Sequence, residues 1–279
     1  MTRGASCFMS TEKNFSTSGL WLIGLGPGNI DLLTLGAVEA IKNCKYVFIE
    51  GYTAHLQKND LKDIQDRFGK WDILMRGAVE KPDELLQLAS QESVGLVIIG
   101  DVLQATTHID LILRCQKLEI PTHIIPGISI TTLIGEVGLQ AYRFGRQTTI
   151  PYSYKSYLPT SPLEVILKNK KNNLHTLVLL DLDPTGMGEK IPQPMSPFVA
   201  IDILKSMCEK LQSEGEPMIE DIGSWKAVLC SNLGTNNQQI KYATLTQLSE
   251  IELEGMHCLI VPDSPHELES LALERWEID

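Results

Sequence analysis

Short apolar runs alternate with amphipathic segments through the first half of the chain. Val94–Ile99 is a nearly unbroken apolar run, typical of a strand that is buried on both faces of a sheet. Leu32–Ile41 instead carries its apolar residues at helical spacing, which favours a helix with one buried face. The alternation predicts a parallel α/β sheet over about residues 20–138. The expected strands are 20–24, 46–49, 72–75, 94–99 and 122–125, and the expected helices are 32–41, 55–68, one beginning at Pro82, 106–118 and 129–137.

The second half of the chain has a less regular pattern. Residues 183–197 contain four prolines and two glycines, which predicts a long loop. The expected strands are 147–151, 174–182, 227–230, 240–242 and 256–261, and the expected helices are one beginning at Ser161, 198–213 and 265–273. We therefore expect an α/β fold of two α/β domains, residues 19–126 with a mainly parallel sheet and residues 127–279 with a mixed sheet, after a flexible extension at 1–18.

The composition is that of an ordinary globular protein. Of the 279 residues, 43% are hydrophobic and 21% are charged, which disfavours disordered, collagen-like and disulfide-stapled classes. The longest apolar runs fall far short of the ~20 residues of a membrane span, and the first 18 residues lack the apolar core of a secretory signal. The six cysteines form no C-x-x-C pair, so we expect a reducing, cytoplasmic location and no metal site.

The net charge of −11 disfavours nucleic acid as a partner, because a polyanion would be repelled on average. The charge is also uneven along the chain. Residues 250–279 hold nine acids and one base, whereas residues 142–175 hold six bases and one acid. These segments could simply form two solvated faces, or they could form a bipolar surface that orients a charged partner.

Parallel sheets bind ligands beyond the carboxyl ends of their strands, which selects four loops here: 24–29, 51–54, 100–106 and 126–129. We expect all four to open on one edge. Gly24–Asn29 is rich in glycine, but it lacks the third glycine of the dinucleotide fingerprint, and Pro27 removes one amide donor. Alone, this loop could equally be a tight turn.

Asp101 directly follows a buried strand, where it could either face a ligand or cap the next helix, a role also open to Thr106. His108, His175 and His257 are isolated histidines and are interpreted as structural. The sequence contains no nucleophile–base motif, so we predict no catalytic side chain. An enzyme of this kind would work by positioning, as in group transfer from an activated donor.

Several of these stretches together resemble a known family. Gly24–Gly28, the Gly100-Asp101 loop and Pro126–Ser129 resemble the tetrapyrrole methylase superfamily, whose members use S-adenosylmethionine. Further stretches resemble its diphthine synthase family in particular, and they lie at Ala105–His108, Gly138–Arg146, Leu174–Asp181, Glu50 with Tyr52-Thr53, and Met256–Pro262. The resemblance covers about residues 20–265, and the sequence departs from the family pattern at Val102 and Gln104.

The resemblance implies a methyltransferase that methylates the amine of a modified histidine on translation elongation factor 2, in diphthamide biosynthesis. It also implies a homodimer in which S-adenosylmethionine binds in the cleft between the two domains. Carried over by position, the donor contacts are Pro27, Asp101, Gln104, Ser129, Ile130, Leu180, Leu233 and His257. No metal, nucleic acid or membrane is implied.

Two other functions remain open at this point. A methylase of corrin precursors would share the glycine loop and the Gly100-Asp101 loop, but it would lack the Ala105–His108 stretch and the Gly138–Tyr142 part of the later one. A non-catalytic protein that binds S-adenosylmethionine is compatible with the departures at Val102 and Gln104.

Overall fold

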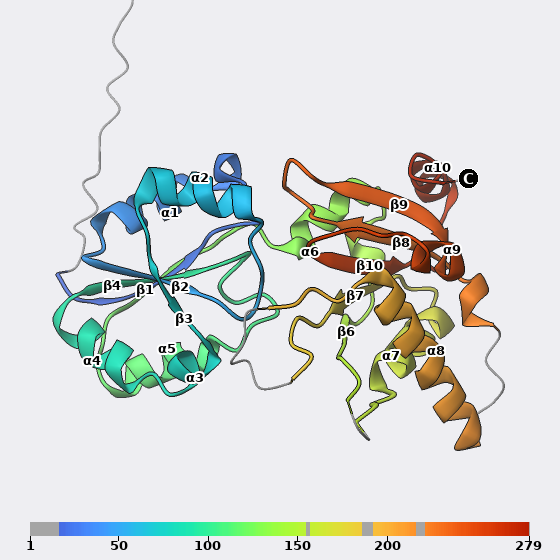
Figure 1. The fold of residues 1–279 in the computed structure, drawn as a ribbon, viewed down its shortest axis with the longest axis horizontal. Helices are drawn as coiled ribbons and strands as arrows, with labels where there is room; N and C mark the ends of the chain where they lie inside the picture. The colour runs from blue at the N-terminus through green and yellow to red at the C-terminus, as the bar shows by residue number, and fades with distance from the viewer. Residues whose placement is uncertain (1–16, 155–156, 186–191, 216–220, 279) are drawn as a thin grey trace, which may run out of the picture.

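The computed structural model describes residues 17–154, 157–185, 192–215 and 221–278. Two five-stranded sheets, each accompanied by helices, account for most of these residues (Figure 1). Residues 1–16 of the predicted extension lie outside the described residues. Within the described part, no helix is both long and apolar enough to cross a membrane.

The first sheet is parallel throughout, as predicted, with the strand order β3-β2-β4-β1-β5. Its strands are β1 (Gly19–Gly24), β2 (Tyr46–Glu50), β3 (Asp72–Leu74), β4 (Ser93–Ile98) and β5 (Thr122–Ile125). Its helices are η1 (Ile30–Leu32), α1 (Leu35–Asn43), α2 (Lys58–Phe68), α3 (Arg76–Glu80), α4 (Asp83–Gln91) and α5 (Ile109–Lys117).

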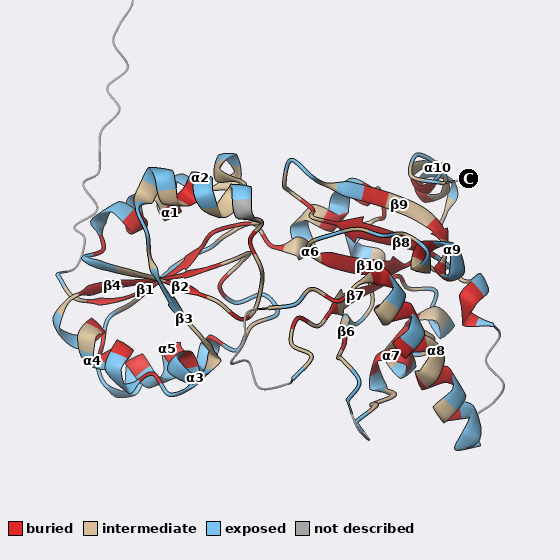
Figure 2. Ribbon diagram, viewed as in Figure 1, coloured by how far each residue is buried: buried red, intermediate tan, exposed pale blue. Residues whose placement is uncertain are grey.

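Alternate residues of β1 face opposite layers of this sheet. Trp21 and Ile23 pack with residues of α1 and α2, whereas Leu20 and Leu22 pack with residues of α3, α4 and α5. Helices therefore cover both faces (Figure 1), and buried residues follow the strands and the inward sides of the helices (Figure 2). Burial on both faces explains why the central strands β1 and β4 are apolar almost without interruption.

The second sheet is mixed, also as predicted, with the order β6-β7-β10-β8-β9; β6 and β7 are parallel and the other pairs are antiparallel. Its strands are β6 (Thr148–Ile150), β7 (Thr176–Leu180), β8 (Lys226–Ser231), β9 (Gln239–Thr244) and β10 (His257–Val261). The accompanying helices are α6 (Ile130–Leu133), η2 (Ile134–Val137), η3 (Ala141–Arg143), α7 (Ser161–Lys171), α8 (Pro197–Ser213), η4 (Ile222–Ser224), α9 (Leu245–Ser249) and α10 (Glu267–Glu274).

Several boundaries differ from the prediction because local hydrogen bonds intervene. The Thr34 side chain accepts from the Ala37 N–H and starts α1 there, so the predicted helix 32–41 divides into η1 and α1. The helix predicted over 106–118 begins only at Ile109, because the Thr106 hydroxyl donates back to the Val102 carbonyl within a loop. The predicted loop 183–197 ends one residue early, since Pro197 is the first residue of α8; residues 186–191 lie outside the described residues.

A buried ionic cluster ties α10 to the second sheet. The Glu269 carboxylate accepts from the Gln140 N–H at 2.9 Å, from His175 Nε2 at 3.1 Å and from Arg143 at 2.7 Å. His175 Nδ1 accepts from the Asp263 N–H, so the proton of the neutral ring lies on Nε2. His175 is therefore structural, as interpreted from the sequence.

Candidate active site

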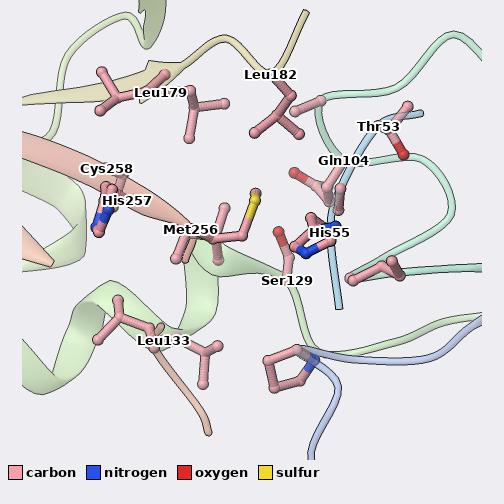
Figure 3. Close-up of a pocket in the computed structure, with 18 of the residues that line it drawn as sticks. Thr53, His55, Gln104, Ser129, Leu133, Leu179, Leu182, Met256, His257 and Cys258 are labelled. Carbon is pink, nitrogen blue, oxygen red and sulfur yellow. The ribbon is translucent and has the colours of Figure 1, made fainter. Parts of the chain in front are cut away.

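A cavity of about 370 Å³ lies between the carboxyl edge of the first sheet and the second sheet. All eight residues predicted to contact a methyl donor line this cavity: Pro27, Asp101, Gln104, Ser129, Ile130, Leu180, Leu233 and His257. Figure 3 shows side chains from both sheets directed into the same space. The structure thus brings together residues that are as far apart in sequence as 27 and 257.

The glycine-rich loop is one of three loops that are tied together at the sheet edge. Gly26 and Gly100 exchange two backbone hydrogen bonds, of 3.0 and 2.7 Å. A Cβ on Gly24 would collide with the Gly127 nitrogen, and one on Gly127 would collide with the Gly100 carbonyl oxygen. Gly24 and Gly127 are thus required because backbones meet there, whereas Gly100 is favoured by its positive φ of 84° and not by crowding.

Asp101 holds two of these loops in place. One carboxylate oxygen accepts from the Leu103 N–H at 2.9 Å and the other from the Gly127 N–H at 3.1 Å. The carboxylate therefore positions its own loop and the loop after β5, while it also lines the cavity. Of the two alternatives, the position facing a ligand site agrees with the cavity lining, whereas the capping role was wrong for both Asp101 and Thr106, because α5 has His108 as its N-cap and no side chain caps it.

The two departures from the family pattern have different environments. Val102 is fully buried in the core beneath the first sheet and is not among the described residues that line the cavity. Gln104 is exposed and lines the cavity, next to Ala105, which has a positive φ of 57°. Val102 therefore leaves the surface of the cavity unchanged, whereas Gln104 adds a polar side chain to it.

Ser129 is the N-cap of α6, and its hydroxyl oxygen accepts from the Thr131 N–H at 3.2 Å. The other side of the cavity is more apolar, with Leu180 and Leu233 both buried. A Cβ on Gly234 would lie 2.6 Å from the Pro27 ring, so the loop after β8 packs directly on the glycine-rich loop. Because Pro27 and Leu233 both line the cavity, this contact lies at its wall.

The His257 ring is already engaged within the protein. Its Nδ1 lies 2.8 Å from the Ser231 hydroxyl and its Nε2 lies 3.2 Å from the Leu253 carbonyl oxygen. Burial lowers the pKa of the ring, and the bond to Leu253 only partly offsets this. A contact between His257 and a ligand would therefore use its main chain.

Sequence reasoning selected the loop after β2, and the resemblance included Glu50, Tyr52 and Thr53 without giving them a role. Glu50, at the end of β2, is 1% exposed, and its carboxylate accepts from the Tyr52 and Thr53 N–H groups and from the Thr53 hydroxyl. Burial raises the pKa of Glu50, while these hydrogen bonds and the charge of Arg76 act against that rise. An acid at the end of an apolar strand was the available signal, and its role is to fix the loop.

Three lining residues from this loop and its neighbours were missed by sequence reasoning, namely His55, Asp60 and Arg76. Burial lowers the pKa of His55, so its ring is neutral at pH 7. Asp60 Oδ2 and Arg76 Nε are buried and have no hydrogen-bond partner among the described residues. Side chains of this kind are expected to meet a ligand, and no sequence motif marks them.

The cavity has apolar walls and a few polar groups, which suits the binding of a small organic molecule. Within the described residues, no group of three His, Cys, Asp or Glu side chains could hold a metal ion. His55 lines the cavity, and its ring makes no hydrogen bond to a serine or cysteine side chain among the described residues. The cavity therefore holds no paired nucleophile and base of that kind within those residues. The site is built to position reactants.

Comparisons with known proteins agree with this geometry. The model of the family described as Tetrapyrrole (Corrin/Porphyrin) Methylases matches residues 19–249. The chain is 34% identical to a diphthine methyl ester synthase of Candida glabrata, over 90% of this chain and 87% of the relative. It is 32% identical to a diphthine synthase of Methanospirillum hungatei, over 92% and 97% of the two chains. A crystal structure of diphthine synthase superposes with a TM-score of 0.79 at 27% identity, covering 92% of this chain and 95% of that chain.

Proposed function

The chain belongs to the tetrapyrrole methylase family and, within it, to the diphthine synthases, and on this premise we propose that it is an S-adenosylmethionine-dependent methyltransferase of diphthamide biosynthesis. The acceptor is the modified histidine of translation elongation factor 2. The enzyme works in the cytoplasm, as a homodimer. The observation that carries the proposal is that the eight residues expected to contact the donor line a single cavity.

The lining of the cavity suits S-adenosylmethionine. A cavity of about 370 Å³ lies in the range of small-molecule sites. Ile130, Leu180 and Leu233 would exclude water from the reacting groups. Each Asp101 oxygen accepts one protein N–H and keeps a lone pair, so the carboxylate can accept a further hydrogen bond from the donor and favours its positive charge. When bound, the donor's sulfonium supplies an electrophilic methyl carbon.

The reaction needs alignment more than a catalytic side chain. The lone pair of the acceptor amine attacks the methyl carbon as the sulfur–carbon bond breaks, and the amine proton passes to water. A cavity that holds both partners in line lowers the barrier through orientation and exclusion of water. Methylation of one nitrogen stops at the quaternary ammonium, which has no lone pair left.

The relatives carry two names that differ in chemistry. A methyl ester synthase also methylates a carboxyl group, and the chain is about equally similar to both kinds, at 34% and 32% identity. The two outcomes can be separated, because mild alkali hydrolyses a methyl ester and leaves methylated nitrogen intact.

The test is to incubate the protein with S-adenosylmethionine and elongation factor 2 that carries the unmethylated histidine intermediate, and to follow the intact mass of the factor. We expect stepwise gains of methyl groups, and alkali treatment will show whether one of them is an ester. Donor binding is measured by calorimetry in parallel. Donor binding without any methyl gain would instead support a methylase of corrin precursors or a silent binder, and absence of both would refute the proposal.

A further inference from the structure

Arg76 is the single cationic side chain among the described residues that line the cavity. Its guanidinium lies over the Tyr52 ring, 5.3 Å from the ring centroid. Its buried Nε has no hydrogen-bond partner in the described part of the chain. A Glu80 oxygen lies 3.8 Å from Nε, which is too far for a hydrogen bond. The guanidinium is thus held by stacking and by a loose ion pair with Glu80, while its Nε–H remains available to a ligand.

The loop that carries Tyr52 is fixed from behind. The buried Glu50 carboxylate binds the N–H groups of Tyr52 and Thr53 and the Thr53 hydroxyl. Because the Tyr52 ring is placed by this loop and Arg76 stacks on the ring, the cation has a defined position before any ligand arrives. Pre-organisation of this kind lowers the entropy cost of binding.

Arg76 also follows a different strand of the first sheet from the predicted donor contacts of that sheet. It follows β3, the edge strand, whereas Pro27, Asp101 and Ser129 follow β1, β4 and β5. Neighbouring strands are ~4.8 Å apart, so β3 is about 14 Å from β1 across the sheet. A ligand group at Arg76 is therefore separated from the glycine-rich loop by the width of three strand spacings.

The charges of the cavity define what this group can be. Three acids, Asp60, Asp101 and Asp181, line it, so among the described lining residues Arg76 is the side chain that attracts an anionic group, although Glu80 offsets part of its charge. A guanidinium binds a carboxylate through two parallel hydrogen bonds. The acceptor of the proposed reaction has an amine, and the methyl ester formed by relatives shows that theirs also has a carboxyl group.

We propose that Arg76, held on Tyr52, binds the carboxylate of the acceptor's amino acid group and so directs the acceptor amine toward the donor methyl. The inference rests on the proposed function. S-Adenosylmethionine also has a carboxylate, so the alternative is that Arg76 binds the donor and not the acceptor. The position of Arg76 beyond β3 favours the acceptor.

The test compares Arg76→Gln, Arg76→Lys and a control, Arg67→Gln, with the unaltered protein. Arg67 also stacks on an aromatic ring, with its guanidinium 5.7 Å from the Phe68 centroid, but it is exposed and is not among the described residues that line the cavity. For each protein we would measure the thermal midpoint, the donor Kd by calorimetry, and KM and kcat for elongation factor 2 that carries the unmethylated intermediate.

For Arg76→Gln we expect KM for the acceptor to rise roughly tenfold to a hundredfold, the range typical of a lost charge-assisted hydrogen bond. The donor Kd should stay within about twofold, and Arg76→Lys should recover part of the loss, because it keeps the charge but loses the planar fork. Arg67→Gln should match the unaltered protein.

An unchanged acceptor KM in a folded Arg76→Gln protein would overturn the inference, and so would a weakened donor Kd with an unchanged KM, which would assign Arg76 to the donor. If Arg76→Gln does not fold, the comparison is made with Arg76→Met, which also removes the charge, so that an unchanged KM has the same meaning. Failure of the unaltered protein to transfer any methyl group would instead refute the proposed function, and the inference with it.

Discussion

Asp101 offers the sharpest test of the proposed donor site, because its carboxylate both ties two loops together and lines the cavity. Asp101→Ala removes the bonds to the Leu103 and Gly127 N–H groups, of 2.9 and 3.1 Å. A hydrogen bond to a charged group contributes about 1.5–3 kcal/mol, and the partial exposure of Asp101 lowers that value. We expect unfolding to become easier by about 2 kcal/mol.

Donor affinity should also fall, and the lower stability does not account for this, because the variant is still folded under the conditions of the binding assay. The alanine variant also loses the negative charge beside the predicted position of the sulfonium donor. We expect donor affinity to fall at least tenfold, equivalent to about 1.4 kcal/mol. Calorimetry measures the affinity, and a thermal melt at matched concentration measures the stability.

Two further variants separate the causes. Asp101→Asn keeps the shape and one oxygen acceptor, but it turns an NH₂ group toward one of the two N–H donors, so it should fall between the alanine variant and the unaltered protein. Asp110→Asn is the control, because Asp110 is an exposed partner of Arg114 on α5 and lies outside the lining of the cavity. Unchanged donor affinity in a folded Asp101→Ala protein would refute the assignment of Asp101 to the donor site.

Three further results are expected. Burial would by itself raise the pKa of Glu269, but hydrogen bonds from Gln140 and His175 outweigh it and lower the pKa from 4.5 to about 2. The resulting stabilisation, about 3 kcal/mol, is complete above pH 4.5 and is lost as the pH falls toward 2. Between these pH values the free energy of unfolding should therefore change less in Glu269→Gln than in the unaltered protein. Equal slopes of this free energy against pH in the two proteins would contradict the prediction. Gly127→Ala should lose donor binding and stability together, because its Cβ would collide with the Gly100 oxygen. The control is Gly69→Ala, whose Cβ meets no atom within 4 Å and which loses stability only through its positive φ. Normal donor binding by Gly127→Ala in calorimetry would contradict this prediction. If the net charge of −11 steers a positively charged partner surface, the rate of association with elongation factor 2 in stopped flow should fall as salt increases, and a flat response would exclude steering.

The pattern of apolar and polar residues was enough to predict all ten strands of the described residues. Burial on one or both faces of a strand leaves alternating or continuous apolar residues, which can be recognised without other sequences. The pattern was weaker for the short helices α3 and α9, each of five residues, which have too few turns for a period to emerge. Helix starts also shifted where a side chain, such as that of Thr34, caps a later turn.

The candidate site was predictable where its residues belong to loops at strand ends. The topological rule for parallel sheets selected the loops that carry Pro27, Asp101 and Ser129, and the resemblance added the residues of the second sheet. The rule does not specify which side chains of a loop turn inward. His55, Asp60 and Arg76 were therefore missed, because their burial depends on how α2 and α3 pack against the sheet.

The sequence by itself determined the alternation of strands and helices, the glycine-rich loop and the family resemblance, since these depend on residues close together in the chain or in a fixed order. Only the tertiary structure decided the strand order β3-β2-β4-β1-β5, which separates β3, the strand before Arg76, from β1, the strand before the glycine-rich loop, while both Arg76 and Pro27 line one cavity. It alone also decided that the Asp101 carboxylate reaches Gly127 and that the His257 ring is engaged by Ser231. These contacts join residues 26 positions apart in both cases, and they form because packing of the two sheets selects one arrangement that no local pattern encodes.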